Sequence, residues 1–465
     1  MKESCATVII VANSPGEISG WASPVVAGLR ALENKITHRL KRIFIVVILP
    51  PCAFATGNEA VVAKNIQGVD AIVTPSEYLS FAILGSLPEG LKRFMAGGKG
   101  KARQGVVLHL GGDHLHSAII ARRLGFPAIA YSDRTIKFQN RFKKILVEDS
   151  RVAKKLGEKG VPDEKISIVG NLMVDSVSGG KIQKNIKDVL GITGDKQVVC
   201  LLPGSRKQEI RYVMPFFLRV AEIMDRFCEN TEFVIPLSPF VNMDLIQSAL
   251  IDSSTEIDRY GNKAKNRGAK LEASTGVLSE LKGMGKGGLL STATIKTSGG
   301  VQVLVVLGSR YSVMAASDIA LCIPGSVTAE LGCLGIPTVV SLPLNIPEEI
   351  PLTGVFEYIG RLPVIGGPIK RVVLQNVNKR IEFTAIPNKR QRKSIMPEIR
   401  GVLTAQDVSI KALELLQDTK TRDRISLELK AAMGRPGAAD KVASTVFNML
   451  TMTGGRYFVP TKESG

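Results

Sequence analysis

With 465 residues, 45% of them hydrophobic and 22% charged, the chain has the size and balance of a globular protein with two or three domains. Aromatic residues amount to 5% and no nucleic-acid-binding motif accompanies the basic residues. The formal net charge of +19 therefore favours an anionic membrane surface or phosphorylated substrates as partners over nucleic acid. The alternative is a basic surface with no dedicated partner. The six cysteines are scattered and form no CxxC pair, which favours buried thiols in a reducing cytoplasm. We find no recognisable signal peptide and no apolar run of roughly 20 residues, so we do not expect a secreted or membrane-spanning protein.

The first part of the chain alternates strands and helices, beginning with an apolar strand over 6–12 and a glycine-containing turn over 13–21. A continuous apolar strand is typical of a parallel sheet that is buried on both faces. Further strands are predicted at 43–49, 71–73, 105–110, 128–131, 144–147 and 166–169, with helices between them, for example at 117–124 and 151–159. This alternation predicts a doubly wound, Rossmann-like α/β domain over 1–175, with its ligand at the carboxyl ends of the strands.

A second α/β series follows a polar linker over 176–196. Strands are predicted at 197–202, 233–236, 301–307, 319–323 and 338–342, and C-terminal helices at 405–416, 421–433 and 438–452. The stretch 252–300, rich in Gly, Lys, Ser and Thr, is expected to be a flexible insertion with partial helix at most. We therefore predict a second α/β domain over 197–420 that faces the first across a cleft, with C-terminal helices over 421–465 packing back.

Two turns in the second domain carry the strongest functional signal. Each follows a strand and opens a helix, so that free backbone N–H groups and the helix dipole favour an anion there. The residues concerned are Gly204, Ser205 and Arg206 in the first turn, and Gly325, Ser326, Thr328 and Glu330 in the second. Arg206 offers a fork of donors to phosphate, whereas Glu330 repels phosphate and suits a ribose diol one helical turn away. The pattern predicts a nucleoside diphosphate site. The alternative is two ordinary strand-to-helix turns with capping Ser and Thr.

With these residues in hand, the chain resembles the lipid-A-disaccharide synthase family of B-type-fold glycosyltransferases. LLPGSRKQEI at 201–210 is similar to the family motif LLPGSR-x-x-E-[IV], and PGSVTAELGCLGIP at 324–337 to its SGTATLE…LGTP segment. Weaker matches are AASD at 315–318, GEISG at 16–20, VGNLMVD at 169–175 and the PN and PE pairs at 387–388 and 397–398. Two departures are Trp21, where the family has Asp, and LGGDHLH at 110–116, which keeps only the Asp of IDxPDFN. The chain is therefore either a family member or a paralogue that acts on another glycolipid.

The resemblance implies an inverting transfer of an acylated glucosamine from a UDP-sugar to a lipid-linked sugar acceptor, without a metal or other cofactor. It implies that the donor binds the second domain, with Asn388 as a further nucleotide contact, and the acceptor binds the first. It also implies a cytoplasmic protein that is peripheral on the inner face of the cytoplasmic membrane. The attacking hydroxyl needs a general base. Asp113 is the first candidate and Glu17 the second, with His114 as a base or an acceptor contact. Asp113 could equally be a helix N-cap.

Two other functions remain as alternatives. One is a UDP-sugar 2-epimerase, which shares the two-domain architecture, and the other is a non-catalytic paralogue that binds a nucleotide or a membrane. A metal site at His109, His114 and His116 is disfavoured because His-x-His ligands share a face only in an extended segment, and a helix is predicted there. The apolar segment 344–356 and the basic clusters at 137–144 and 389–393 are candidates for membrane contact.

Overall fold

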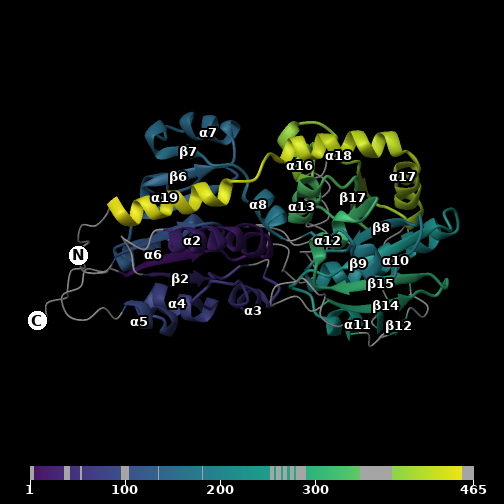
Figure 1. The fold of residues 1–465 in the computed structure, drawn as a ribbon, viewed down its shortest axis with the longest axis horizontal. Helices are drawn as coiled ribbons and strands as arrows, with labels where there is room; N and C mark the ends of the chain where they lie inside the picture. Colours follow the sequence, from purple (N-terminus) through teal and green to yellow (C-terminus); the bar gives the residue numbers. More distant parts are fainter. Residues whose placement is uncertain are drawn as a thin grey trace, which may run out of the picture. The chain divides into compact units, whose positions relative to one another are not determined.

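The computed structural model describes residues 5–35, 42–52, 55–95, 104–134, 136–180, 182–251, 290–345 and 380–452, together with four short strands between 256 and 278. Contacts within the chain divide it into two units (Figure 1). Unit 1 comprises residues 1–179 and 434–465, and unit 2 comprises residues 180–433. The boundary at 179–180 falls within the segment that the sequence predicted to be a linker.

Unit 1 is built on a parallel sheet in the order β3-β2-β1-β4-β5-β6-β7. Its strands are β1 (Cys5–Val11), β2 (Arg42–Ile48), β3 (Ala71–Val73), β4 (Gly105–His109), β5 (Ala128–Ser132), β6 (Lys144–Val147) and β7 (Ile166–Ile168). In β1, Ile9 pairs with Val46 of β2 and with Val107 of β4, and it is fully buried. The strand order changes direction between β1 and β4, so the loops after these two strands flank the switch point where α/β folds bind ligands.

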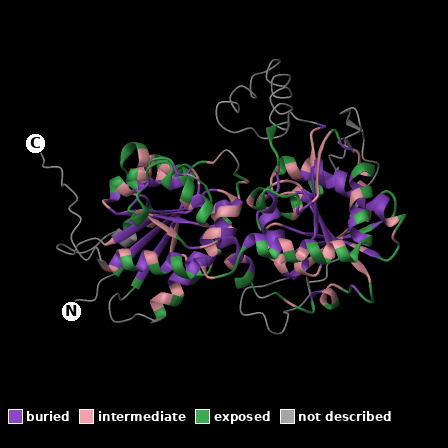
Figure 2. Cartoon of the chain, turned by 90° about the horizontal axis from the view of Figure 1, so that it is seen from above, coloured by how far each residue is buried: buried purple, intermediate pink, exposed green. Residues whose placement is uncertain are grey.

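Helices cover the unit 1 sheet, with their outward sides exposed and the strands buried (Figure 2). They are α1 (Pro15–Glu17), which continues as a π-helical turn (Ile18–Ala22), α2 (Ser23–Lys35), α3 (Glu59–Lys64), α4 (Pro75–Leu84), α5 (Glu89–Met95), α6 (His114–Leu124), α7 (Ser150–Gly157), α8 (Leu172–Gly179) and α19 (Ala438–Met452). One apolar core joins α4, α5, α6 and α7 to the strands, for example through Phe81, Leu91, Ile120 and Leu156. Helix α2 packs against α8 and α19.

The last helix of the described residues, α19, belongs to unit 1, although α16 to α18 before it belong to unit 2. Asp175 caps its start, because its two carboxylate oxygens accept hydrogen bonds from the backbone N–H groups of Gly437 (2.7 Å) and Ala438 (3.0 Å). Gly28 of α2 lets the helix approach closely, since an added Cβ there would lie 3.3 Å from the Cβ of Ala443. The Asp of the VGNLMVD segment thus attaches the C-terminal helix.

Unit 2 contains a second, mostly parallel sheet in the order β12-β14-β15-β9-β8-β16-β17-β18. Its strands are β8 (Gln197–Leu202), β9 (Thr231–Pro236), β12 (Lys270–Glu272), β14 (Leu290–Lys296), β15 (Gln302–Leu307), β16 (Ile319–Cys322), β17 (Thr338–Pro343) and β18 (Glu398–Gly401). Its helices are α9 (Ile186–Val189), α10 (Lys207–Asp225), α11 (Met243–Ile251), α12 (Arg310–Ala315), α13 (Ser326–Leu334), α16 (Ile386–Gln391), α17 (Ala405–Gln417) and α18 (Thr419–Met433). The switch point of this sheet lies between β8 and β16.

The two Rossmann-like sheets confirm the predicted fold class, and strands β3, β6 and β8 have the predicted bounds. Six described strands were not predicted, namely β10 (Glu256–Ile257), β11 (Lys263–Ala264), β12, β13 (Val277–Leu278), β14 and β18. The expectation of partial helix at most in 252–300 is therefore wrong, because β12 and β13 pair with β14 and extend the unit 2 sheet. Strand β14 lies inside the stretch 252–300, where it pairs antiparallel with β15, and β18 is a short strand beside β17. The rest of 252–300, apart from the short strands β10 to β13, lies outside the described residues, as does most of the apolar segment 344–356.

Candidate functional site

The two predicted anion turns lie side by side in unit 2. Strands β8 and β16 are parallel neighbours, and their last residues, Leu202 and Cys322, are paired in register. The turns that follow them therefore emerge at the same edge of the sheet, and each opens a helix, α10 after Arg206 and α13 after Gly325.

The start of helix α13 is open. Its N-cap residue is Gly325, which has no side chain to cap the first turn, and an added Cβ at Gly325 would meet no atom within 4 Å. Gly325 and Ser326 are both exposed. An uncapped helix start with space in front of it, at the switch point of an α/β sheet, has the geometry of a phosphate site.

The start of helix α10 differs from the expectation because a carboxylate of the chain already occupies it. Glu209 accepts hydrogen bonds from the backbone N–H groups of Ser205 (2.8 Å) and Arg206 (3.0 Å). The same carboxylate pairs with the guanidinium of Arg206. Gly204, with φ of +116°, lies directly against Glu209, since an added Cβ would be 2.4 Å from its Oε2. The donors expected to hold a diphosphate from this side are thus engaged within the chain. The spacing of Arg206 and Glu209 is that of a capping box, so the sequence contained the signal.

The other predicted residues of α13 are buried. The Thr328 hydroxyl donates to the backbone oxygen of Gly325 (2.8 Å) and accepts from the backbone N–H of Ile386 (3.0 Å), so it joins α13 to the start of α16. Glu330 is 3% exposed, and its Oε2 lies 2.6 Å from Nη1 of Arg310. The sequence interpretation did not include Arg310, because no local pattern shows that the start of α12 reaches α13.

Asn388 lies in a buried network at the start of β18. Its side-chain oxygen accepts from the backbone N–H groups of Ile395 and Met396, both at 2.9 Å. Its amide nitrogen donates to the backbone oxygen of Met396 (2.8 Å) and to Glu398 (2.9 Å). Burial raises the pKa of Glu398, but hydrogen bonds from Thr384, Ala385 and Asn388 lower that pKa by more. Asn388 is therefore used to order this segment, and its contact with a nucleotide stays a prediction.

In unit 1, Glu17 connects the two loops at the switch point. Its carboxylate accepts from the backbone N–H groups of Asn13 (3.0 Å) and Ser14 (3.1 Å), and from that of Gly112 (3.2 Å) in the loop after β4. The contact with that loop is tight, since an added Cβ at Gly111 would lie 1.9 Å from the carboxyl carbon of Glu17. Burial raises the pKa of Glu17 in spite of these hydrogen bonds. Glu17 therefore orders both loops, which favours a positioning role over that of a base.

Asp113 is exposed and is the N-cap of α6, where its Oδ1 accepts from the backbone N–H of Leu115 (2.9 Å). The N-cap alternative is thus correct, but it engages only one carboxylate oxygen. His114 follows at the first position of α6. Its ring lies 4.4 Å from that of His109 and 6.0 Å from that of Phe142, and its buried Nε2 has no hydrogen-bond partner in the described part of the chain. Burial lowers the pKa of His114 by more than the nearby Asp113 raises it, so the neutral form of the imidazole is favoured.

The remaining histidines of this segment have internal partners. Nδ1 of His109 is 2.8 Å from the Ser117 hydroxyl, and Nδ1 of His116 is 2.7 Å from the hydroxyl of Tyr78. Burial lowers the pKa of His109 to about 3. Within the described residues, no three His, Cys, Asp or Glu side chains are placed together to hold a metal ion. Trp21, which replaces a family Asp, packs edge-to-face against Tyr131 with ring centroids 5.3 Å apart.

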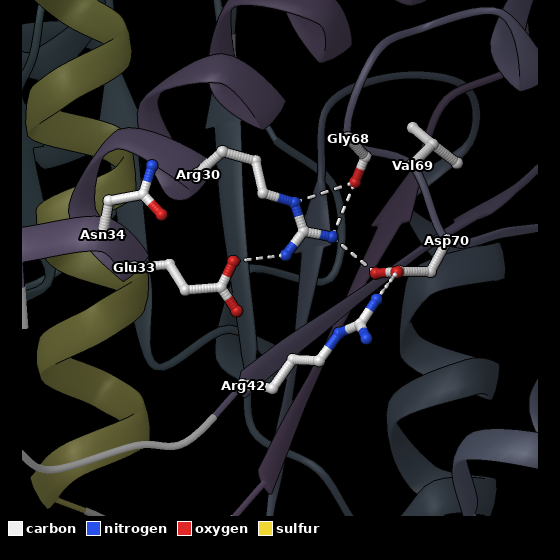
Figure 3. A pocket seen from close by; sticks show the side chains of 7 residues that line it. All are labelled: Arg30, Glu33, Asn34, Arg42, Gly68, Val69 and Asp70. Atoms are coloured by element: carbon white, nitrogen blue, oxygen red, sulfur yellow. Dashed lines mark hydrogen bonds and ion pairs between the residues drawn. The ribbon is translucent and has the colours of Figure 1, made fainter. Parts of the chain in front are cut away.

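A charged hollow lies at the opposite, amino edge of the unit 1 sheet (Figure 3). Arg30 donates to the backbone oxygen of Gly68 (2.6 Å) and to Glu33 (2.6 Å), and pairs with Asp70 (2.5 Å). Arg42 reaches the other oxygen of Asp70 at 2.8 Å. Two cations and two carboxylates neutralise one another here, so this hollow ties α2 to the starts of β2 and β3 and is not our candidate site.

Two Rossmann-like units with glycine turns at the switch point of unit 2 define a protein of the B-type glycosyltransferase fold class. A UDP-GlcNAc 2-epimerase from Neisseria meningitidis, solved with UDP-GlcNAc bound, has a TM-score of 0.52 and 14% identity, over 96% of this chain and 100% of that chain. A likeness at this identity concerns the fold alone.

Comparison at the level of sequence is narrower. A family model described as lipid-A-disaccharide synthetase matches residues 161–277. Lipid-A-disaccharide synthase from Gloeothece citriformis is 21% identical over 304 residues, which cover 64% of this chain and 61% of the relative. That of Prochlorococcus marinus is 23% identical over 290 residues, which cover 61% and 58%. The chain is thus similar in sequence to lipid-A-disaccharide synthases, as the motif at 201–210 predicted, and its matches span about three fifths of these relatives' length.

Proposed function

We propose that the protein is an inverting glycosyltransferase that moves an acylated glucosamine from a UDP-sugar to a lipid-linked sugar acceptor. The observation that carries the proposal is the open start of helix α13, which emerges beside the turn after β8 at the switch point of unit 2. The sequence relationship to lipid-A-disaccharide synthases supports the choice of donor and acceptor.

The donor would place its diphosphate at the start of α13, with the Ser326 hydroxyl as a further donor and the ribose near Glu330. As the glycosidic bond to the diphosphate breaks, negative charge develops on the leaving oxygen. Fixed N–H groups at a helix start stabilise that charge without reorganising. The Glu209 carboxylate holds the neighbouring turn, which includes Arg206, in one conformation.

The acceptor hydroxyl would attack the anomeric carbon from the side opposite to the leaving diphosphate, and a general base would take its proton. Asp113 suits this role because it is exposed at the switch point of unit 1 and its second carboxylate oxygen is not used by the N-cap bond. Glu17 orders the loop that carries Asp113, and the neutral imidazole of His114 adjoins it.

An anionic membrane surface would present the lipid-linked acceptor, and we place the protein on the inner face of the cytoplasmic membrane. Support comes from the net charge of +19 and from helix α4, where Ile83 and Leu84 are 71% and 77% exposed. Apolar side chains that stand out of a basic protein suit a peripheral contact with lipid. No helix in the described residues has both the length and the apolar character to cross a bilayer.

The test is to incubate the protein with UDP-diacylglucosamine and a monophosphorylated, acylated glucosamine, and to follow the disaccharide by mass spectrometry and free UDP by a coupled assay. Asp113→Asn is the informative variant because Asn is an equally good N-cap but not a base. We expect unchanged stability and a rate reduced by roughly 10²–10⁴-fold. Release of UDP with a 2-epimerised sugar and no disaccharide would favour the epimerase alternative. If neither product forms, both the glycosyltransferase proposal and the epimerase alternative are contradicted.

A further inference from the structure

Arg310 forms a buried ion pair that the motifs of the second domain do not include. It is the first residue of α12, and its side chain is 18% exposed. Its Nη1 lies 2.6 Å from Oε2 of Glu330, which is on the neighbouring helix α13 and 3% exposed. Ser309, just before it, has φ of +43°, a left-handed conformation that is uncommon outside glycine. The backbone is thus bent at the point from which Arg310 reaches α13.

The ion pair is only partly satisfied by the protein. Nε of Arg310 is buried and has no hydrogen-bond partner in the described part of the chain. Oε2 of Glu330, although 2.6 Å from Nη1 of Arg310, is likewise buried without a hydrogen-bond partner there, and no described group donates a hydrogen bond to Oε1. A buried ion pair whose remaining donors and acceptors are unused contributes little to stability, because desolvation offsets the attraction. Such a pair is better explained as part of a binding site, in which a ligand uses the remaining donors and acceptors.

The position of Glu330 also requires a compensating charge. It lies one helical turn after Ser326, at the helix start that we assign to the diphosphate. An unpaired carboxylate so close to that site would repel the ligand. Arg310 cancels the charge of Glu330 while leaving Oε1 available, which explains how a carboxylate can adjoin a phosphate site.

We propose that Arg310 is a positioning residue for the nucleotide ribose: it holds Glu330 in place and neutralises it, so that Oε1 accepts a hydrogen bond from the ribose 2′-hydroxyl. This inference rests on the proposed function, since it needs a uridine nucleotide at α13. It adds a residue outside the motifs that connect the chain to its family. It also predicts selectivity for ribose over deoxyribose, which an ion pair that only stabilises the fold would not provide.

The test is calorimetric titration of UDP and of 2′-deoxy-UDP into the wild type, Arg310→Met, Arg310→Lys and the double variant Arg310→Met/Glu330→Gln. The wild type should bind UDP at least about tenfold more tightly than 2′-deoxy-UDP, because the analogue leaves Oε1 unpaired. In Arg310→Met this ratio should fall to near one, and UDP affinity should fall by about tenfold or more, since the Glu330 charge is no longer compensated. Arg310→Lys keeps the charge and should retain most of the UDP affinity, and it covers the case in which Arg310→Met does not fold.

The double variant separates charge from positioning. Removing the Glu330 charge as well should recover part of the UDP affinity lost in Arg310→Met, without restoring selectivity for ribose. A folded Arg310→Met that keeps the wild-type ratio of the two affinities, with only a lowered melting temperature, would overturn the inference and leave a structural ion pair. Equal wild-type affinity for both nucleotides would overturn it too. No binding of UDP by the wild type would instead refute the proposed function on which it rests.

Discussion

A carboxylate introduced at the start of helix α13 should weaken UDP binding and at the same time stabilise the helix. Ser326→Asp puts the new charge at the first helical position, which is exposed and uncapped. A negative charge there improves helix stability by about 0.3–1 kcal/mol. The same charge about 5 Å from a phosphate repels it by about 0.8 kcal/mol in water and about 3 kcal/mol at an effective dielectric constant of 20. Because the diphosphate carries more than one charge, UDP affinity should fall by roughly tenfold or more.

The measurement is calorimetric titration of UDP at low and high salt, with thermal unfolding in parallel. Gln208→Asp is a matched control, since it adds the same charge to the first turn of α10, where Glu209 already holds the backbone N–H groups. Its effect on UDP should be smaller. The loss in Ser326→Asp should shrink in 1 M salt, where the Debye length is about 3 Å. Wild-type UDP affinity in a folded Ser326→Asp would refute the phosphate site at α13.

Three further predictions concern stability and use the one tryptophan, Trp21, whose fluorescence reports on unit 1 alone. Asp175→Ala should lower the free energy of unfolding of unit 1 by about 2–4 kcal/mol in urea, because it removes the charged acceptor of two backbone hydrogen bonds at the start of α19. Asp440→Ala, which removes an exposed acid from the first turn of the same helix, should cost less, about 0.3–1 kcal/mol. His109 has a pKa of about 3 in the folded protein and about 6.5 in the unfolded chain, so the unfolded chain binds more protons between these two pH values. The free energy of unfolding of unit 1 should therefore fall by roughly 2–3 kcal/mol from pH 7 to pH 4.5. His109→Asn should flatten this pH dependence, and an unchanged slope would exclude His109 as its source. Glu209→Ala should destabilise unit 2 by about 1–3 kcal/mol, because it removes the acceptor of two backbone hydrogen bonds at the start of α10. The unfolding transition followed by circular dichroism should move, whereas the transition followed by Trp21 fluorescence should not. A matching change in both transitions would contradict a local effect.

The sequence predicted the fold well where chemistry is local. Buried parallel strands need apolar residues at every position, so strands such as β1 and β8 stand out as continuous apolar runs. Strand β14 was missed because only some of its residues face the core, and LSTATIK lies in a stretch dominated by Gly, Lys, Ser and Thr. Strand β18 is four residues long and half-buried throughout, so it has almost no apolar signal.

The candidate site was predictable in its backbone but not in its side-chain pairing. Pro-Gly turns after apolar strands identified the helix starts at Lys207 and Ser326. Which of them is open depends on whether a carboxylate such as Glu209 folds back over its own N–H groups. The pairing of Arg310 with Glu330 joins helices α12 and α13, which meet only in the folded unit, and a single sequence contains no signal for such a contact.

Calorimetric titration of UDP into the wild type and into Glu330→Gln tests the central claim most directly. Our account predicts a clear UDP signal in the wild type, weakened in Glu330→Gln by about 1–3 kcal/mol, because a charged acceptor for a ribose hydroxyl is replaced by a neutral one. A folded wild-type protein that does not bind UDP would contradict the account and limit the relationship to the fold.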